Sequence, residues 1–176
     1  TPKLDGNAVE LVYFECRLVN ATTRGDGEFG EDITEKMKYI LGTEYTSVSD
    51  NLHQITGEVI SCKDIQNSRN LVAGALNIKD FEEFKSRVEE LDIKFIAYSA
   101  EGIEYDTYIT LLDDLLDYDF LTPISEEVRN KVSLGMIKTD GIVYRLNDQK
   151  KFKEMGYTAK FPRGAFAVKE DAEYQI

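Results

Sequence analysis

Histidine is almost absent from this chain of 176 residues, since His53 is the only one. A single histidine excludes multi-histidine metal sites and leaves little room for a Ser/His/Asp triad, so we interpret it as an ordinary strand residue. Cysteine is scarce as well. Cys16 and Cys62 fit no metal-ligand spacing and make a weak case for a disulfide. We expect both to be reduced thiols, as in a cytoplasmic protein.

Long apolar runs and linkers are also missing. No stretch approaches the roughly 20 apolar residues that cross a bilayer, and no secretory leader is visible, so we expect a cytoplasmic protein without a membrane partner. Only three prolines occur, with no Gly/Ser-rich linker and no internal repeat. The 42% hydrophobic and 31% charged content is that of a globular protein, and we expect residues 1–176 to form a single domain.

Positive charge is in deficit. Asp and Glu total 33 against 21 Lys and Arg, which leaves a formal net charge of -12. Proteins that grip duplex DNA usually carry a basic surface, because neutralisation of phosphates dominates their non-specific affinity. We therefore expect this chain to bind DNA poorly by itself. If it acts on DNA, other modules supply the affinity for the duplex.

Alternating apolar and polar residues predict strands, and apolar residues three and four apart predict helices. The predicted strands are Asn7–Phe14 and Arg17–Thr23, which form a hairpin, then Leu52–Ser61, Lys94–Ser99, Gly141–Asn147 and Ala165–Lys169. The predicted helices are Glu31–Leu41, Asp80–Leu91, Tyr108–Tyr118, Glu126–Val132 and Gln149–Met155. Because they show no regular βαβ alternation, we expect an α+β fold with antiparallel sheets.

Candidate chemistry begins at Lys3, Asp5 and Gly6, in the tetrapeptide KLDG. A lysine attacks phosphorus only after losing its proton, which burial beside other cations favours. Asp5 could steer the lysine or hold a metal, and Gly6 would let the backbone approach a ligand closely. Taken alone, the tetrapeptide is more typical of a solvated lysine before a turn.

A second feature is the glycine-rich stretch from Thr23 to Asp32, TRGDGEFGED. Its glycines permit close approach of the backbone, and Arg24 offers a planar fork that suits ribose or phosphate. Asp32 and the residues after it have the character of a helix start. A glycine-rich hairpin loop is the simpler alternative.

In this order, KLDG and TRGDGEFGEDIT resemble two motifs of the adenylation domain of NAD+-dependent DNA ligases, K-x-D-G and T-R-G-D-G-x-x-G-E-D-V-T. The resemblance continues along the chain. ITGEVIS around Glu58 looks like the family's G-E motif, NSRN around Arg69 like N-P-R-N, and FIAY ending at Tyr98 like F-x-A-Y. DGIV from Asp140 to Val143 is similar to D-G-V-V, GYT with Pro162-Arg163 is similar to G-F-T and P-R, and AFAVK ends at the late lysine, Lys169.

The resemblance implies a nucleotidyltransferase (ATP-grasp-like) core of antiparallel sheets flanked by helices. Residues 1–176 would be this adenylation core alone, lacking the N-terminal domain that recognises nicotinamide mononucleotide and the downstream DNA-binding domains. The implied activity is that of a DNA ligase. Lys3 attacks the α-phosphorus of NAD+ with release of nicotinamide mononucleotide, and AMP then passes to the 5'-phosphate of a DNA nick for sealing.

The resemblance also implies roles for single residues. Lys3 would act with Asp5 and with Lys169, which clamps the α-phosphate and favours the neutral form of Lys3 by its charge. Tyr98 would stack on one face of adenine, and the stem of Arg145 would cover the other.

Further roles concern ribose, phosphate and metal. Val143 would also line the nucleotide site. Glu58 would accept from a ribose hydroxyl or, with Asp140, hold Mg2+ or Mn2+. The implied phosphate, ribose or nicked-strand contacts are made by Arg24, Arg69 and Arg163.

Three positions depart from the family pattern. Thr1 stands where the family has a glutamate that reads the adenine amino group, and Asn77 stands where it tends to have a second arginine. Arg145 replaces a lysine, and its fork is not interchangeable with an ammonium. These differences indicate a divergent member with altered DNA contacts.

Two alternatives stay open. One is a ligase or capping-type nucleotidyltransferase that uses ATP or GTP, against which the glycine-rich stretch argues. The other is a split or isolated adenylate-binding module that needs other domains for catalysis. In that case the chain binds adenosine-containing ligands but seals nicks poorly by itself.

Overall fold

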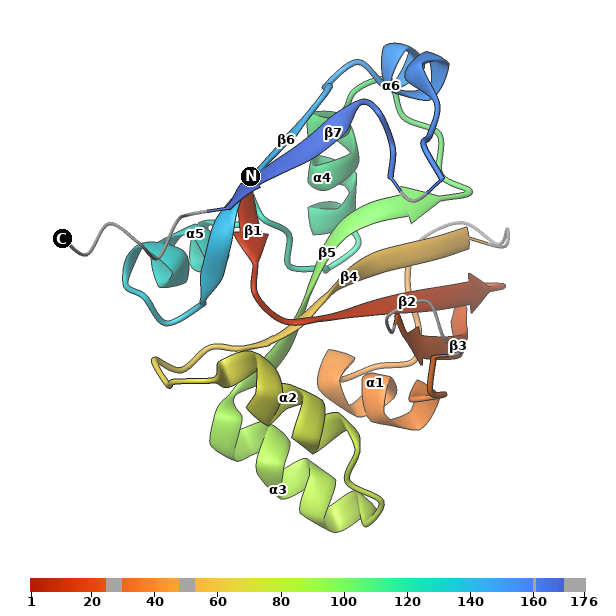
Figure 1. Ribbon diagram of the computed structural model, residues 1–176. Coiled ribbons are helices and arrows are strands. Elements are labelled where there is room, and N and C mark those ends of the chain that lie inside the picture. Colours follow the sequence, from red (N-terminus) through yellow and green to blue (C-terminus); the bar gives the residue numbers. More distant parts are fainter. Residues whose placement is uncertain (25–29, 48–52, 160, 170–176) are drawn as a thin grey trace, which may run out of the picture.

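The computed structural model of the protein describes residues 1–24, 30–47, 53–159 and 161–169 (Figure 1). The strands are β1 (Pro2–Leu4), β2 (Asn7–Phe14), β3 (Arg17–Thr23), β4 (His53–Ser61), β5 (Ile93–Glu101), β6 (Thr139–Arg145) and β7 (Ala165–Lys169). The helices are α1 (Thr34–Leu41), α2 (Ser68–Leu76), α3 (Phe81–Leu91), α4 (Tyr108–Asp117), α5 (Glu126–Ser133) and α6 (Gln149–Met155).

A four-stranded antiparallel sheet in the order β3-β2-β4-β5 carries the main hydrophobic core. Alternate residues of β2, namely Val9, Leu11 and Tyr13, are almost fully buried on one face. Leu111, Leu112 and Leu115 of α4 join the same cluster, together with buried residues of α1, α2 and α3. Because apolar and polar residues alternate along β2, one face of the sheet packs against helices and the other is left for polar side chains.

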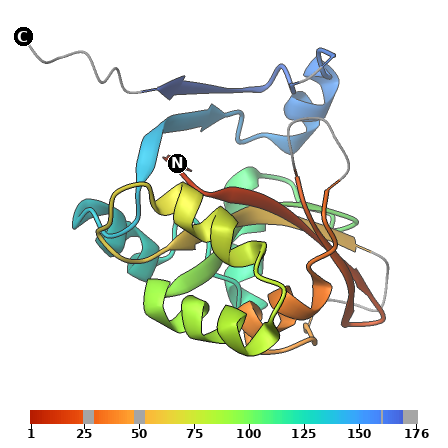
Figure 2. The ribbon, with the colours of Figure 1, turned by 60° about the horizontal axis from the view of Figure 1, so that its bottom comes forward.

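A second, three-stranded antiparallel sheet has the order β1-β6-β7. Figure 2 shows β6 and β7 as a layer on one side of the large sheet, with α1, α2 and α3 on the opposite side. A smaller apolar cluster joins the two sheets, in which Leu4 of β1 meets Ile60 of β4, Ile96 of β5 and Val128 of α5. Ile60 and Ile96 alternate with the buried residues of the main core, so this cluster lies on the polar side of the large sheet.

Side-chain caps define where three of the helices begin. Asp80, Thr107 and Asp148 each accept a hydrogen bond from the backbone N–H three residues further on, at 2.9, 3.2 and 3.0 Å. Such caps satisfy donors that the first turn leaves unpaired. Asp32 plays a related part before α1, since its Oδ1 accepts from Thr34 N at 3.0 Å.

The α+β class and the antiparallel sheets are confirmed. The predicted bounds of β2, β3, β7 and α6 agree with the structure, and the other predicted elements differ by one to three residues at their ends. Two elements were missed. The strand β1 is too short to show a period. The helix α2 lies in a stretch read only as a motif, although Val72, Ala75 and Leu76 have helical spacing and are buried.

His53 lies in β4, as expected, where it is buried and stacks on Tyr13 with ring centroids 5.3 Å apart. Cys16 and Cys62 form no disulfide within the part of the chain that the structure describes. Burial raises the pKa of the Cys62 thiol to about 11. Across the same four ranges, no helix is both long and apolar enough to cross a bilayer.

Candidate functional site

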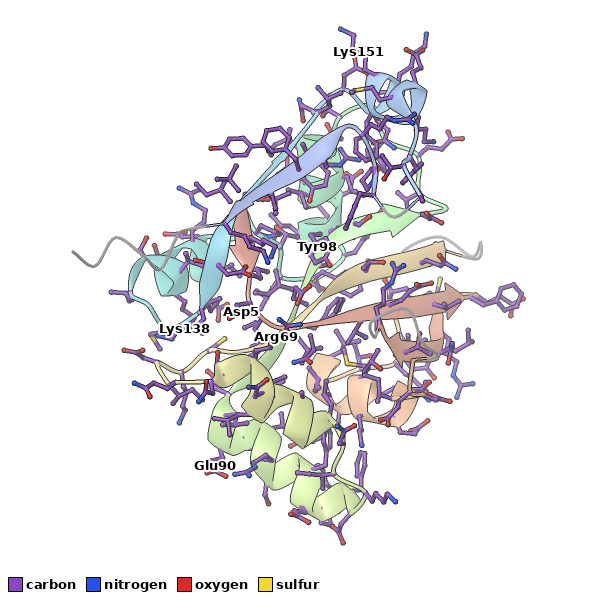
Figure 3. The ribbon with its side chains drawn as sticks, viewed as in Figure 1. Asp5, Arg69, Glu90, Tyr98, Lys138 and Lys151 are labelled. Atoms are coloured by element: carbon purple, nitrogen blue, oxygen red, sulfur yellow. The ribbon has the colours of Figure 1, made fainter. Side chains whose placement is uncertain are left out.

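A cavity of about 340 Å³ lies between the two sheets, beside the turn that joins β1 to β2. Ligand pockets are typically of this size or larger. The charged side chains that line it are Lys3, Asp5, Arg24, Glu58, Arg69 and Asp140, for all of which the sequence predicted a functional role. In Figure 3 the labels of Asp5 and Arg69 lie at this turn and that of Tyr98 lies close by.

Lys3 is held by Asp140 across the small sheet. The strand β1 pairs with β6, so that these two residues lie on neighbouring strands. Lys3 Nζ donates to Asp140 Oδ2 at 3.0 Å, and the two side chains are 31% and 35% exposed. An ion pair with this much solvent contributes little to stability. Its effect is to fix the direction in which the amine points.

A bulge in β6 brings Asp140 to the cavity. Pro2 lies opposite Ile142 while Leu4 lies opposite Thr139, so β6 carries one extra residue in this pairing. Simple alternation would put residues 140 and 143 on opposite faces, yet Asp140 and Val143 both line the cavity. Gly141 makes the bulge possible. Its φ is +145°, and a Cβ there would lie 2.0 Å from the Val168 carbonyl oxygen of β7.

The turn at Asp5 and Gly6 passes the chain from the small sheet to the large one. A Cβ on Gly6 would lie 2.4 Å from the Val59 carbonyl oxygen of β4, so only glycine fits this approach. The sequence predicted that Gly6 lets the backbone approach a ligand. The close approach that the structure shows at Gly6 is to the backbone of β4. Asp5 N donates to Lys138 O at 3.0 Å, which anchors the turn beside β6 and places Asp5 on the cavity wall.

Glu58 lines the cavity from the polar side of the large sheet. Burial raises the pKa of Glu58 to about 7, and the hydrogen bond from Tyr98 and the charges of Arg69 and Lys3 oppose this rise only in part. Tyr98 OH donates to Glu58 Oε1 at 3.2 Å. Near neutral pH, Glu58 can therefore exist in either protonation state, and small changes in its surroundings decide between them.

Tyr98 is the extra residue of a bulge in β5, because Gly57 lies opposite Ala97 and Thr56 lies opposite Ser99. Bulges turn side chains to new directions, and here the bulged tyrosine lines the cavity. Burial raises the pKa of Tyr98 well above its ordinary value, so its hydroxyl stays a donor at neutral pH.

Tyr108 is a cavity residue for which the sequence predicted no functional role. It was expected only as the start of a helix, and no motif distinguishes it from other helical tyrosines. Its hydroxyl donates to the Tyr98 carbonyl oxygen at 2.6 Å, and burial raises its pKa to about 12. This hydrogen bond holds the backbone of Tyr98 in place.

Arg24 and Arg69 both line the cavity near the start of β2. Arg24 follows β3, where its N–H donates to Ala8 O at 2.8 Å, and its guanidinium lies 3.8 Å from a Glu10 carboxylate oxygen. Arg69 lies in the first turn of α2, and its carbonyl oxygen accepts from Asn7 Nδ2 at 3.1 Å. Residues 25–29 of the glycine-rich stretch lie outside the described residues.

Lys169 and Arg163 are not among the described residues that line this cavity. Lys169 pairs with Gly141 at the end of β7 and is exposed. Alternation from Ala167, which pairs with Val143, places Lys169 on the face of the small sheet that Val143 presents to the cavity. Arg163 is exposed, and its Nη1 donates to Met155 O at 3.4 Å.

Arg145 was predicted to cover a ligand in the cavity with its stem. It too is missing from the lining of the cavity over the described ranges. Its guanidinium carbon lies 4.2 Å from the ring centroid of Tyr108 and 3.8 Å from that of Phe152. The side chain is therefore held between two aromatic rings.

The described ranges contain no group of three or more His, Cys, Asp or Glu side chains that could hold a metal ion by themselves. Asp140 Oδ1, however, is buried and has no hydrogen-bond partner among the described residues. Mg2+ is usually bound by only one or two carboxylates, with water and substrate phosphates completing its shell. Asp140 and Glu58 are compatible with that mode.

Comparison with known proteins identifies relatives of this chain. The family model described as "NAD-dependent DNA ligase adenylation domain" matches residues 1–137. The DNA ligase of Clostridium tetani is 33% identical over 205 residues, covering 98% of this chain and 30% of that protein. The DNA ligase of Aquifex aeolicus is 31% identical, with 96% and 28% covered, and that of Alkaliphilus metalliredigens is 32% identical, with 97% and 30% covered.

The chain spans less than a third of the length of these curated relatives. The residues matched by the family model include five of the six charged side chains in the cavity, and Asp140 lies just beyond them. The motifs, the cavity and the matches therefore agree. The chain belongs to the family of NAD-dependent DNA ligase adenylation domains.

Proposed function

We propose that this chain is the nucleotide-loading core of an NAD+-dependent DNA ligase, in which Lys3 takes up AMP. The observation that carries the proposal is the Lys3–Asp140 pair, which lines the same cavity as Glu58 and Tyr98. The two antiparallel sheets would then be the walls of a nucleotidyltransferase (ATP-grasp-like) core, with the nucleotide between them.

In the loading step, Lys3 Nζ attacks the α-phosphorus of NAD+. A P–N bond forms, the pyrophosphate P–O bond breaks, and nicotinamide mononucleotide leaves with the electron pair of that bond. Lys3 must first give up a proton, and Asp140 Oδ2, which accepts a hydrogen bond from Nζ at 3.0 Å, is the acceptor that we assign. Catalysis of phosphoryl transfer consists mainly of such positioning and of charge stabilisation.

In the following steps, an oxygen of the 5'-phosphate at a DNA nick attacks the lysine-bound AMP and the P–N bond breaks. The 3'-hydroxyl of the nick then displaces AMP and closes the strand. Arg69 in the first turn of α2 and the exposed Arg163 are the residues that we assign to phosphates of the nicked strand.

The remaining cavity residues bind and orient the nucleotide in this proposal. Tyr98 stacks on adenine, Glu58 accepts from a ribose hydroxyl, and Val143 packs from the small sheet. Arg24 contacts ribose or phosphate. Asp5 steers Lys3 from the turn.

Lys169 is assigned to the α-phosphate, because it extends from the face of the small sheet that Val143 presents to the cavity. A cation at that place would stabilise negative charge as it develops on the phosphate. A divalent cation, Mg2+ or Mn2+, would be held by Glu58 and by Asp140 Oδ1, which has no hydrogen-bond partner in the part of the chain that the structure describes. When bound, the ion neutralises charge on the phosphate oxygens.

Residues 1–176 would form a single adenylation domain, in the cytoplasm and without a membrane partner. A formal charge of -12 disfavours tight binding of duplex DNA by this chain alone. The relatives are more than three times as long as this chain. This difference supports the proposal that further ligase domains, on the same or another chain, act with it. Nicked duplex DNA and NAD+ are thus the proposed substrates of the whole assembly.

Intact mass tests the loading step. The full-length protein that contains this chain is incubated with NAD+ and Mg2+ and weighed. We expect a mass increase of one AMP, none in Lys3→Ala, and the full increase in Lys151→Ala, a control at an exposed lysine of α6. If the protein acquires no AMP, or if Lys3→Ala still does, the proposal is wrong.

Labelled NAD+ and labelled ATP separate the two donors. Label transferred from ATP but not from NAD+ would favour the ATP-using alternative. Nick sealing then tests the need for further domains, since we expect the isolated chain to bind adenosine-containing ligands while sealing nicks poorly. Efficient sealing by the isolated chain would contradict that dependence.

A further inference from the structure

Arg145 occupies an aromatic clamp at the far end of the cavity. The residue ends β6, and its guanidinium lies between the rings of Tyr108 and Phe152, at 4.2 and 3.8 Å from their centroids. A cation so close to two ring faces is attracted by both. The clamp joins β6 to the start of α4 and to α6 (Figure 1).

Hydrogen bonds occupy the edge of the same guanidinium. Nη2 donates to Gln149 Oε1 at 2.7 Å and to Tyr105 OH at 3.4 Å, while Nη1 donates to Leu146 O at 3.0 Å. Gln149 is itself buried. With both faces and both terminal nitrogens engaged, Arg145 would have to leave the clamp before it could contact a ligand in the cavity.

The backbone around the clamp holds the two parts of the molecule together. Tyr108 N donates to Asn147 O at 2.8 Å, and Gln149 N donates to Asp106 O at 3.0 Å. These bonds link the loop before α4, which follows β5 of the large sheet, to the loop after β6 of the small sheet. The side chain of Arg145 completes this junction.

A continuous set of contacts runs from the clamp to the cavity wall. Tyr108, under the guanidinium, donates to the Tyr98 carbonyl oxygen at 2.6 Å, and Tyr98 OH donates to Glu58 Oε1 at 3.2 Å. All three residues line the cavity. A shift of Tyr108 would therefore be transmitted to the side chains that face a bound molecule.

We propose that Arg145 is a positioning residue, which holds Tyr108 and through it Tyr98 in place and does not touch the nucleotide. This inference rests on the proposed function, because it takes the occupant of the cavity to be an adenine nucleotide. The arginine fork is required for it, since Nη1 donates to Leu146 O while Nη2 donates to Gln149 and Tyr105.

Binding of adenosine and of AMP to the full chain, measured by calorimetry, tests the role. Arg145→Met keeps the length of the side chain and removes the fork, whereas Arg87→Met changes an exposed arginine of α3 as the matched control. We expect Arg145→Met to weaken both ligands by the same factor, about three- to tenfold, and the control to change neither. A larger loss for AMP than for adenosine would indicate direct contact with phosphate and overturn the proposal.

Tyr108→Phe, which removes the bond to the Tyr98 carbonyl, provides the second measurement. If Arg145 acts through Tyr108, Arg145→Met should have a smaller effect in Tyr108→Phe than in the unchanged protein. Fully additive losses would contradict that route. Should Arg145→Met fail to fold, Arg145→Lys preserves the charge without the fork and should weaken both ligands equally.

Hydrogen exchange without ligand separates this inference from the proposed function. Backbone amides of residues 105–109 and 96–99 should exchange faster in Arg145→Met than in the unchanged protein, with α2 and α3 unaffected. If the unchanged protein binds neither adenosine nor AMP while exchange rises as stated, the proposed function fails and the anchoring role of Arg145 stands. Unchanged exchange at 105–109 would refute the anchoring role itself.

Discussion

Glu58 should make the protein less stable as the pH rises from 5 to 8. Its pKa in the folded protein is about 7, raised from 4.5 by burial beside the cavity. The unfolded chain exposes the carboxyl group, so its pKa returns to the ordinary value. Between these two values the folded state holds a proton that the unfolded state releases, and stability therefore falls with increasing pH in this window.

The size of the effect follows from the displacement of the pKa. Each pH unit is worth about 1.36 kcal/mol, so a change from 4.5 to about 7 corresponds to about 3 kcal/mol over the full range. About 2.5 kcal/mol of this falls between pH 5 and pH 8, because titration has already begun at pH 5. The loss is complete once the pH is above the folded pKa.

Urea denaturation at pH 5, 6, 7 and 8 measures this loss. Other groups titrate as well, so the quantity of interest is the difference between the unchanged protein and Glu58→Gln, which cannot ionise. Glu154→Gln, at an exposed glutamate of α6, is the matched control and should follow the unchanged protein. If the stability of Glu58→Gln changes with pH in parallel with that of the unchanged protein, the conclusion that burial raises the pKa of Glu58 is refuted.

Three further outcomes follow from the same cavity. Asp140→Asn should slow AMP loading of Lys3 by about 10²-fold in single-turnover measurements while changing stability little, and unchanged loading would count against the pair. Tyr98→Phe removes a hydrogen bond that lowers the pKa of Glu58, so that pKa should rise further in a 13C-NMR titration; a fall would contradict this account. Gly141→Ala should lower the free energy of unfolding, measured by urea denaturation, by about 1–3 kcal/mol or more, since φ is +145° and a β7 carbonyl blocks the new Cβ. An unchanged free energy would show that the strands can separate there.

The elements with a clear period were predictable from the sequence. The hairpin Asn7–Phe14 and Arg17–Thr23 was predicted with the bounds that the structure has, because alternation reports directly which side chains face the core. The strand Pro2–Leu4 was missed, since three residues carry no period and its pairing with β6 joins segments 135 or more residues apart. Helix α2 was missed for another reason, as its motif drew attention from the helical spacing of Val72, Ala75 and Leu76.

The residues of the candidate site were likewise predicted only in part. The motifs pointed to Lys3, Asp5, Glu58 and Asp140, and the structure gathers them around one cavity. They could not predict Tyr108, because a tyrosine at the start of a helix has no distinguishing pattern.

Arg145 shows the limit most plainly. The motif implied a residue whose stem covers a ligand, and it could not predict that the side chain lies between two aromatic rings from other elements. Where a flexible side chain ends depends on which partners the fold brings near it, and a linear motif does not contain that information.

The sequence by itself determined the family, the antiparallel α+β class and the identity of the charged residues at the site. These follow from residue type, order and short-range period, which are properties of the chain before it folds. Only the tertiary structure decided how the residues meet. The bulges at Gly141 and Tyr98, the Lys3–Asp140 pair and the raised pKa of Glu58 all arise from strand register and burial. Register and burial are set by contacts between distant segments, so they exist only once the two sheets have packed together.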